Sequence, residues 1–268
     1  MLTAPTCMPS KKHSKNKTST REDTMTEIRA GLPLSSPMTW LSRGWNDMLC
    51  TGMRGTYYGA FFAVMGYAIS MVYDNLWQAT MGVTAGFFLM GPFICTGIYE
   101  LSRQRDNGQP YNLIASWTAW FRNWKSIAFF AAMLTFFMIV WARVSVVLFA
   151  LFASHDYPTL QSMLAQIISV KNFEFLFVWM GVGFVFASLV FAISVVSVPL
   201  LLDRGTDTLE AVFASARALW ANPGVCLVWG LSIVVIIGLS LAIFIPILVL
   251  TAPWVGHATW RAYKALVV

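Results

Sequence analysis

The sequence is short of charged residues. Only 11% of its 268 residues are Asp, Glu, Lys or Arg, and 57% are hydrophobic. Soluble domains carry roughly a quarter charged residues, which cover the surface and leave the apolar side chains for one core. A chain with so little charge has more apolar surface than a water-soluble core can bury. The composition therefore indicates a membrane protein.

Motifs typical of enzymes are also missing. The sequence has no Walker phosphate loop, no HExxH, no Ser-His-Asp spacing and no paired acidic motif. Of the three histidines, His13 and His155 lie outside the apolar runs, so the chain cannot hold a haem between two intramembrane histidines. The cysteines have no zinc or CxxC spacing, being Cys7, Cys50, Cys95 and Cys226. We expect no enzyme activity, no cofactor, and no catalytic or metal-binding residues.

The first 35 residues differ from the rest of the chain. The stretch "KKHSKNKTSTRED" is polar and basic and has no periodic apolar residues. Such a segment cannot bury enough apolar surface to fold alone. No signal-peptide core follows it at the expected distance, and Met25 is an alternative start. We predict that residues 1–35 form a disordered basic cytoplasmic tail.

Several apolar runs approach or exceed the ~20 residues that cross a bilayer. The predicted spans cover residues 56–73, 77–100, 126–152, 173–201, 224–243 and 245–263. The last two are divided only near Pro246, and without that division there are five. We predict an all-α fold, a polytopic membrane helix bundle of about six spans in three hairpins. Residues 36–268 then form a single integral membrane domain.

Basic residues lie mostly on one side of these spans. Of the 18 Lys and Arg residues, 16 lie in the N-terminal region, the 101–125 and 202–223 loops and the C-terminus. The positive-inside rule places both termini in the cytoplasm. The net charge of +6 therefore reports orientation rather than nucleic-acid binding. We predict a multi-pass protein of the bacterial inner membrane, with membrane lipids among its partners.

Two segments that precede spans resemble each other. "LIASWTAWFRN" (113–123) and "VFASARALWAN" (212–222) are both amphipathic, and "MTWLSRGWNDML" (38–49) has a similar stripe. Asp207 with Glu210 predicts a capping box for the second, and Pro110 predicts an early helical residue for the first. The shared positions are Ala115 with Ala214, Ser116 with Ser215, Ala119 with Ala218, and Asn123 with Asn222.

The simplest interpretation of this likeness is an internal repeat. Each copy contains a cytoplasmic interfacial amphipathic helix followed by a membrane hairpin, and the copies cover residues 36–104, 110–205 and 207–265. The alternative is that amphipathic helices beside spans share tryptophan and alanine without being repeats.

The repeat brings three polar residues into register. When the span ends are aligned through their terminal basic residues, Thr96, Ser197 and His257 occupy one equivalent position. In one interpretation the hydroxyls bond to carbonyls of their own helices and His257 bonds an adjacent helix. In the other, the three side chains line a shared polar cavity.

Arg143 interrupts a long apolar run and needs an explanation, because an arginine in hydrocarbon costs at least a few kcal/mol. Together with Trp141 it is consistent with the outer membrane interface. Alternatively it forms an ion site inside the bundle with Glu174 or Asp156. Glu100 and Asp203, at the ends of spans, are typical of solvated helix-end charges.

Three further stretches carry a family resemblance: "FAISVVSVPLLLDRGTD", "ARALWANPGV" and "GHATWRAYKALV". They resemble a bacterial family of integral membrane proteins with domain of unknown function 2189. The resemblance extends from about residue 36 to the end of the chain. Members of that family are sometimes labelled cytochrome c oxidase subunits, but the family implies no established activity or catalytic residues.

Together these patterns favour a structural or accessory protein that organises lipid or a membrane complex, with a protein partner or as a homo-oligomer. One alternative is a small-solute transporter or channel, with Arg143 and the level of Thr96, Ser197 and His257 as its polar path. A second alternative is a cofactor-free accessory subunit of a respiratory oxidase.

Overall fold

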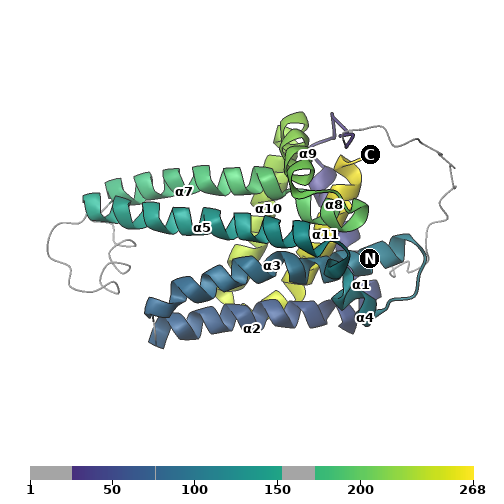
Figure 1. Cartoon of the computed structure of the whole chain (residues 1–268), viewed down its shortest axis with the longest axis horizontal. Coiled ribbons are helices and arrows are strands. Elements are labelled where there is room, and N and C mark those ends of the chain that lie inside the picture. The colour runs from purple at the N-terminus through teal and green to yellow at the C-terminus, as the bar shows by residue number, and fades with distance from the viewer. Residues whose placement is uncertain (1–25, 76, 153–172) are drawn as a thin grey trace.

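The computed structural model describes residues 26–75, 77–152 and 173–268, and these ranges are helical (Figure 1). The β-type pairing in them is an isolated bridge between Ile28 and Val267, and they contain no strand. The predicted all-α fold is therefore confirmed. The elements are α1 (Ser36–Thr51), α2 (Met53–Asn75), α3 (Trp77–Asp106), α4 (Leu113–Trp117), η1 (Ala119–Asn123), α5 (Trp124–Phe152), α7 (Phe173–Ser194), α8 (Ser197–Arg204), α9 (Thr208–Ala221), α10 (Pro223–Ile243), η3 (Ile245–Ile247) and α11 (Leu248–Leu266).

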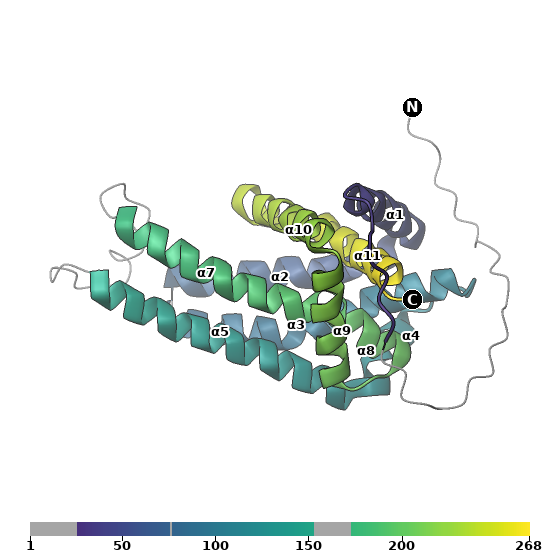
Figure 2. The same ribbon diagram turned by 90° about the horizontal axis from the view of Figure 1, so that it is seen from above.

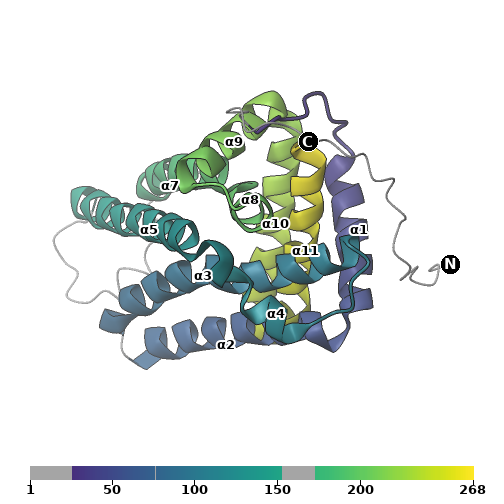
Figure 3. The same ribbon diagram turned by 45° about the vertical axis from the view of Figure 1, so that its right-hand side comes forward.

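The long helices pack with their neighbours in sequence. Helix α2 lies beside α3, α5 beside α7, and α10 contacts α11 (Figures 1 and 2). The shorter helices α1, α4, α8 and α9 gather around the end of the bundle that also holds the C-terminus (Figure 3). The molecule thus has one end of long apolar helices and one end of short helices.

Three helical segments are long and apolar enough to cross a membrane: Leu113–Phe152, Glu174–Arg204 and Pro223–Ile243. They contain the predicted spans 126–152, 173–201 and 224–243 almost completely. The other predicted spans fall in α2, α3 and α11. These segments are helical but are not among the three that are long and apolar enough to cross a membrane. Helix α2 has 23 residues, about 34 Å at 1.5 Å per residue, but its glycines and tyrosines lower its hydropathy.

The fourth predicted span is not one continuous helix. Helix α7 ends at Ser194 and α8 begins at Ser197. Pro199 has no N–H to donate to the carbonyl of Val195, four residues earlier, and its ring clashes with that carbonyl in a straight helix. A break just before Pro199 is the expected consequence, and α7 and α8 together still form the segment Glu174–Arg204 that is long and apolar enough to cross a membrane.

The chain also breaks where the sequence placed the last division. Helix α10 ends at Ile243, Phe244 is extended, and α11 begins at Leu248 after a short 3-10 turn that contains Pro246. By contrast, α11 continues through Pro253 and α3 through Pro92. The apolar stretch from 224 to 263 therefore contains two helices, as predicted.

The predicted helix starts are partly correct. Asp207 caps α9 by accepting a hydrogen bond from Glu210 N at 2.8 Å. The Glu210 carboxylate accepts instead from the Thr26 hydroxyl at 2.7 Å, so it ties down the N-terminal segment. Pro110 precedes helix α4 and lies outside it, which corrects the expectation of an early helical residue. Asn112 caps α4 and accepts from Ala115 N.

The N-terminal segment is ordered from Thr26 onward. Arg29 N donates to Leu266 O at 2.9 Å, and Val268 N donates to Glu27 O at 3.0 Å. The prediction of a disordered tail is therefore wrong for residues 26–35, because backbone pairing with the C-terminus holds them. Residues 1–25 lie outside the described residues.

The buried core lies at the end with the short helices. Leu200, Leu201, Ala214 and Trp260 are fully buried there, where α3, α8, α9 and α11 meet. The long helices instead present large apolar side chains on the outside. On α5 and α7 these include Phe136, Leu151, Phe177, Met180 and Phe184, each at least 60% exposed. Such a surface suits contact with lipid tails.

Candidate functional site

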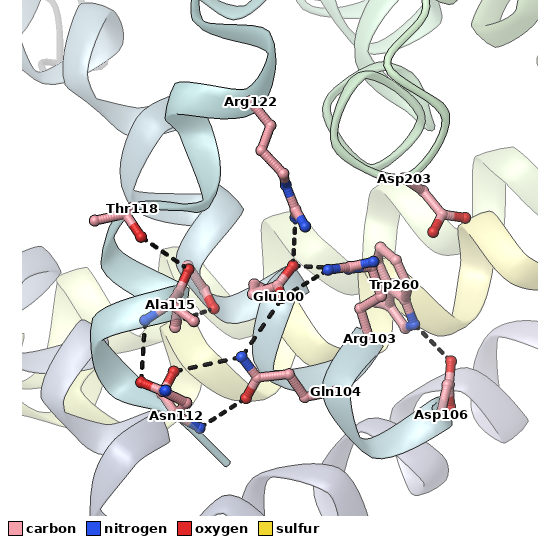
Figure 4. A network of polar contacts seen from close by, with 12 residues as sticks. Glu100, Arg103, Gln104, Asp106, Asn112, Ala115, Thr118, Arg122, Asp203 and Trp260 are labelled. Carbon is pink, nitrogen blue, oxygen red and sulfur yellow. Dashed lines mark hydrogen bonds and ion pairs between the residues drawn. The ribbon is translucent and has the colours of Figure 1, made fainter. Parts of the chain in front are cut away.

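Polar side chains cluster at the end of the bundle that carries the short helices. The first group, here the Glu100 cluster, comprises Glu100, Arg103, Gln104, Asn112 and Arg122 (Figure 4). Glu100 is 3% exposed, and its carboxylate accepts from Arg103 Nε at 2.7 Å and from Arg122 Nη2 at 2.6 Å. This carboxylate therefore connects α3 to η1.

Gln104 positions the loop that leads into α4. Its amide nitrogen donates to Glu100 Oε1 at 3.4 Å, and its oxygen accepts from Asn112 N at 2.9 Å. Asn112 in turn caps α4. One chain of hydrogen bonds thus runs from Glu100 to the first turn of α4 (Figure 4).

A cavity of about 530 Å³ lies over this cluster, between the end of α3 and α4. It is open to the surface and lined by two arginines, one carboxylate and three side-chain amides. The lining residues are Glu100, Arg103, Gln104, Gln109, Pro110, Asn112, Ala115, Thr118, Ala119 and Arg122.

A second group, the Asp47 cluster, joins α1, α3 and α11. Asp47 is a buried residue, and its carboxylate accepts from both Arg105 and Arg261. Arg261 also donates to Asp106 at 2.6 Å, and Trp260 Nε1 donates to Asp106 at 2.9 Å. Burial raises the pKa of Asp47, and Arg261 and Arg105 oppose that rise. The cluster therefore fastens three helices together.

Glu100 and Asp203 do not behave as simple solvated helix-end charges. Glu100 is buried among its two arginines. Asp203 accepts from the Tyr263 hydroxyl at 2.8 Å and from Lys264. The solvated interpretation is wrong for Glu100, because η1 folds back and covers the end of α3.

His257 is completely buried between α1 and α3. Its Nδ1 lies 2.6 Å from Ser102 Oγ, and its Nε2 lies 3.4 Å from Thr51 Oγ1. Both ring nitrogens therefore face hydroxyl groups of adjacent helices. The side chain links α11 to two other helices.

Thr96 and Ser197 are also buried, and their hydroxyls bond to backbone. Thr96 donates to Phe93 O at 2.6 Å, and Ser197 donates to Ile193 O and to Ala211 O. No hydrogen bond within residues 26–75, 77–152 and 173–268 joins Thr96, Ser197 and His257 to one another. Their contacts match the interpretation in which each side chain bonds within its helix or to a neighbouring one.

Arg143 lies on an exposed face of α5, far along the helix from the polar clusters. No salt bridge connects it to Glu174 in the part of the chain that the structure describes. Its other suggested partner, Asp156, lies outside that part. Trp141, two residues earlier, packs against Trp179 with ring centroids 5.4 Å apart.

Almost every buried polar side chain is satisfied by a protein partner. Among the described residues, Thr206 Oγ1 is the buried side-chain atom without one. The same residues bring no three His, Cys, Asp or Glu side chains together as a metal site would require.

Sequence reasoning missed the residues that form the two clusters: Asp47, Arg105, Arg122 and Arg261. Counting cations assigned the arginines to orientation alone. A signal was present for Asp47, because helical periodicity places it on one face with Trp40 and Gly44, away from the stripe that contains Met38 and Trp45. An acid on the face that packs against other helices predicts a buried partner.

Comparison with known proteins gives a match to one family model over part of the chain. No curated protein and no solved structure matches the chain. A family model does match, and its range contains the whole Glu100 cluster together with Arg143, Thr96 and Ser197. Residues 80–203 match the family described as "Predicted integral membrane protein (DUF2189)", which confirms the expected family resemblance over this part of the chain.

Proposed function

We propose that this protein is a structural or accessory component of the bacterial inner membrane, built from three repeats that close into a ring. The observation that carries the proposal is the use of its buried polar residues. Thr96 bonds within its own helix, whereas Ser197 joins α8 to α9 and His257 joins α11 to α3 and α1. The polar chemistry inside the fold is thus directed to holding the bundle together.

The repeat boundaries define unit one as residues 36–104, unit two as 110–205 and unit three as 207–265. Matched serines support this division. Ser116 of unit two donates to Gly97 O of unit one at 2.7 Å, and Ser215 of unit three donates to Ala192 O of unit two at 2.7 Å. Each serine joins a short helix to the last helix pair of the preceding unit.

Contact between the first and last units supports closure of the ring. Helix α1 of unit one packs along α11 of unit three (Figure 3). The approach is closest at Gly44, where an added Cβ would lie 2.6 Å from the backbone nitrogen of Ala258. Helix α1 thus packs on unit three as α4 packs on unit one and α9 on unit two.

The matched asparagines support the same order. Asn123 of unit two donates to Thr206 O, in the connection that leads to α9. Asn222 of unit three donates to Arg29 O at 2.7 Å and accepts from Leu32 N at 3.0 Å, in the segment that leads to α1. Each asparagine therefore anchors the entry to the next short helix around the ring.

The outer surface of α9 supports a place at the membrane interface. Leu209, Phe213 and Trp220 are 61%, 64% and 89% exposed, whereas Ala211 and Ala214 on the other side are buried. Helix α9 crosses the ends of α5 and α7 (Figure 2). An exposed apolar stripe on a helix that lies across the span ends suits the boundary between headgroups and lipid tails.

The full arrangement in this proposal has six spans, formed by α2, α3, α5, α7 with α8, α10 and α11. Both termini then lie on one side, together with the Glu100 and Asp47 clusters. The excess of Lys and Arg at that end favours the cytoplasmic face. Membrane lipid is one partner in this proposal, and a protein of a membrane complex or a second copy of the chain is another.

The transporter alternative has less support, because its suggested path does not connect. Arg143 is exposed on α5, while Thr96, Ser197 and His257 bond to separate neighbours. An accessory subunit of a respiratory oxidase is a special case of the accessory role. It is retained as the second alternative.

A native mass spectrum of gently extracted full-length protein tests the proposal. We expect a chain that carries lipid or partner subunits and no stoichiometric solute, metal or haem. A bound small solute would favour transport, and would direct attention back to Arg143 and His257. A bound redox cofactor would overturn the non-catalytic role.

A further inference from the structure

At the cavity over the Glu100 cluster, some arginine N–H groups have no hydrogen-bond partner within the described residues. Arg103 uses Nε and Nη2 on Glu100, and Arg122 uses Nη2. A guanidinium has five N–H donors, so Arg103 Nη1 and Arg122 Nε and Nη1 have no hydrogen-bond partner within the described residues. Both arginines line the cavity. The Arg122 side chain is 46% exposed and the Arg103 side chain 25%, so a ligand from outside can reach them.

The charge of the cavity favours an anion. Two guanidinium groups face one carboxylate, which leaves the lining with one net positive charge. The side-chain amides of Gln109 and Asn112 stand in the same wall and add neutral donors. Planar guanidinium groups with several N–H donors bind phosphate oxygens well, since two parallel hydrogen bonds form at once.

Exposed apolar side chains lie within two positions in sequence of residues that line the cavity. Ile114 at the start of α4 is 77% exposed, and Phe121 and Trp124 are 59% and 51% exposed. Exposed aromatic and aliphatic side chains beside a basic pocket are typical of the depth at which lipid headgroups lie. An anion that carries acyl chains can place its charged group in the cavity and its chains against exposed apolar side chains such as these.

We propose that this cavity is a binding site for a phosphate group, held by Arg103 and Arg122. The phosphate comes from an anionic lipid headgroup or from free phosphate. The lipid source rests on the position of the Glu100 cluster at the cytoplasmic face in the proposed function, whereas the phosphate site itself does not. Glu100 then has a second role, because it holds both guanidinium groups at the base of the cavity.

Two measurements on the full-length protein test the site and separate the sources. Calorimetric titration in uncharged detergent measures binding of inorganic phosphate. Native mass spectrometry after extraction from vesicles of equal parts phosphatidylglycerol and phosphatidylcholine measures retained lipid. We expect saturable phosphate binding, or about one phosphatidylglycerol retained in preference to phosphatidylcholine. Lipid without phosphate binding assigns the lipid source, and phosphate binding without lipid preference assigns the free anion.

Variants locate the site. Arg122→Gln should weaken the observed binding by roughly tenfold or more, since it removes charge-assisted hydrogen bonds. Arg122→Lys should restore part of the loss by keeping the charge. Arg43→Gln is the matched control, because it removes an exposed arginine from another short helix, α1, outside the cavity. It should leave binding unchanged.

A fourth variant guards against a folding defect. Thr118→Glu places a carboxylate in the cavity wall and removes exposed hydrogen bonds from the Thr118 hydroxyl to Ile114 O and Ala115 O, but it replaces none of the partners in the bonds between Glu100 and its arginines. It should abolish binding at an unchanged melting temperature. Equal losses in Arg122→Gln and Arg43→Gln would overturn the proposal, and so would a wild type that neither binds phosphate saturably nor retains phosphatidylglycerol in preference to phosphatidylcholine. Neither result bears on the scaffold role, which fails instead if a solute other than phosphate, or a redox cofactor, is found.

Discussion

At the scale of single residues, Asp47 carries the charge whose removal should destabilise the protein most. Its carboxylate lies between Arg105 and Arg261, and the three side chains are 3%, 13% and 17% exposed. We expect Asp47→Asn to lower the free energy of unfolding by about 3 kcal/mol, because removal of one partner leaves buried charge uncompensated. Thermal unfolding in detergent, followed by circular dichroism, measures the loss.

The control for this variant is another carboxylate. Glu174 lies on an exposed face of α7 and forms no salt bridge within the described ranges. Glu174→Gln should leave the melting temperature almost unchanged. Equal melting temperatures for Asp47→Asn and the wild type would mean that the cluster does not fasten α1 to α11.

At the scale of secondary-structure elements, the backbones of α2 and α11 approach each other unusually closely. A Cβ added to Gly59 would lie 2.0 Å from the carbonyl oxygen of Val249, which is backbone and cannot rotate away. We expect Gly59→Ala to force the two helices apart and to destabilise the protein by about 2 kcal/mol. The shift in the melting temperature in detergent checks this value.

A glycine on the neighbouring helix provides the comparison. The sequence contains a GxxxG spacing at Gly82 and Gly86, which is typical of close helix contacts. The surroundings of Gly82 lie outside the described side chains, and a Cβ at Gly86 would meet nothing within 4 Å. Gly86→Ala should therefore be neutral or slightly stabilising. A larger loss at Gly86 than at Gly59 would contradict the close packing of α2 on α11.

At the scale of the whole molecule, the proposed ring places both termini on one side of the membrane. Backbone pairing of Ile28 with Val267 brings the N-terminal segment and the C-terminus together. With six spans and the positive-inside rule, that side is cytoplasmic. Green fluorescent protein fused after Val268 should therefore fluoresce, whereas alkaline phosphatase fused at the same position should be inactive.

Either reporter can refute this orientation. An active phosphatase and a dark fluorescent fusion would place the C-terminus outside the cytoplasm. That outcome would favour an odd number of spans or an inverted protein. The phosphate site would then keep its chemistry but lose its cytoplasmic position.

The sequence by itself determined the properties that depend on composition and local pattern. Low charge and long apolar runs were enough to indicate the membrane class and the helical content, since a bilayer requires backbone hydrogen bonds to close within each helix. The cap at Asp207 and the break near Pro246 were predictable, because a cap or a proline acts over a few residues.

Only the tertiary structure decided which polar groups meet. Asp47 and Arg261 are far apart in the chain, as are Ser102 and His257, and no local pattern pairs them. The burial of Glu100 depends on η1 folding back over α3. Helix periodicity tells which residues share a face but not which helix covers it, so the polar clusters and the cavity had to come from the packing of the whole chain.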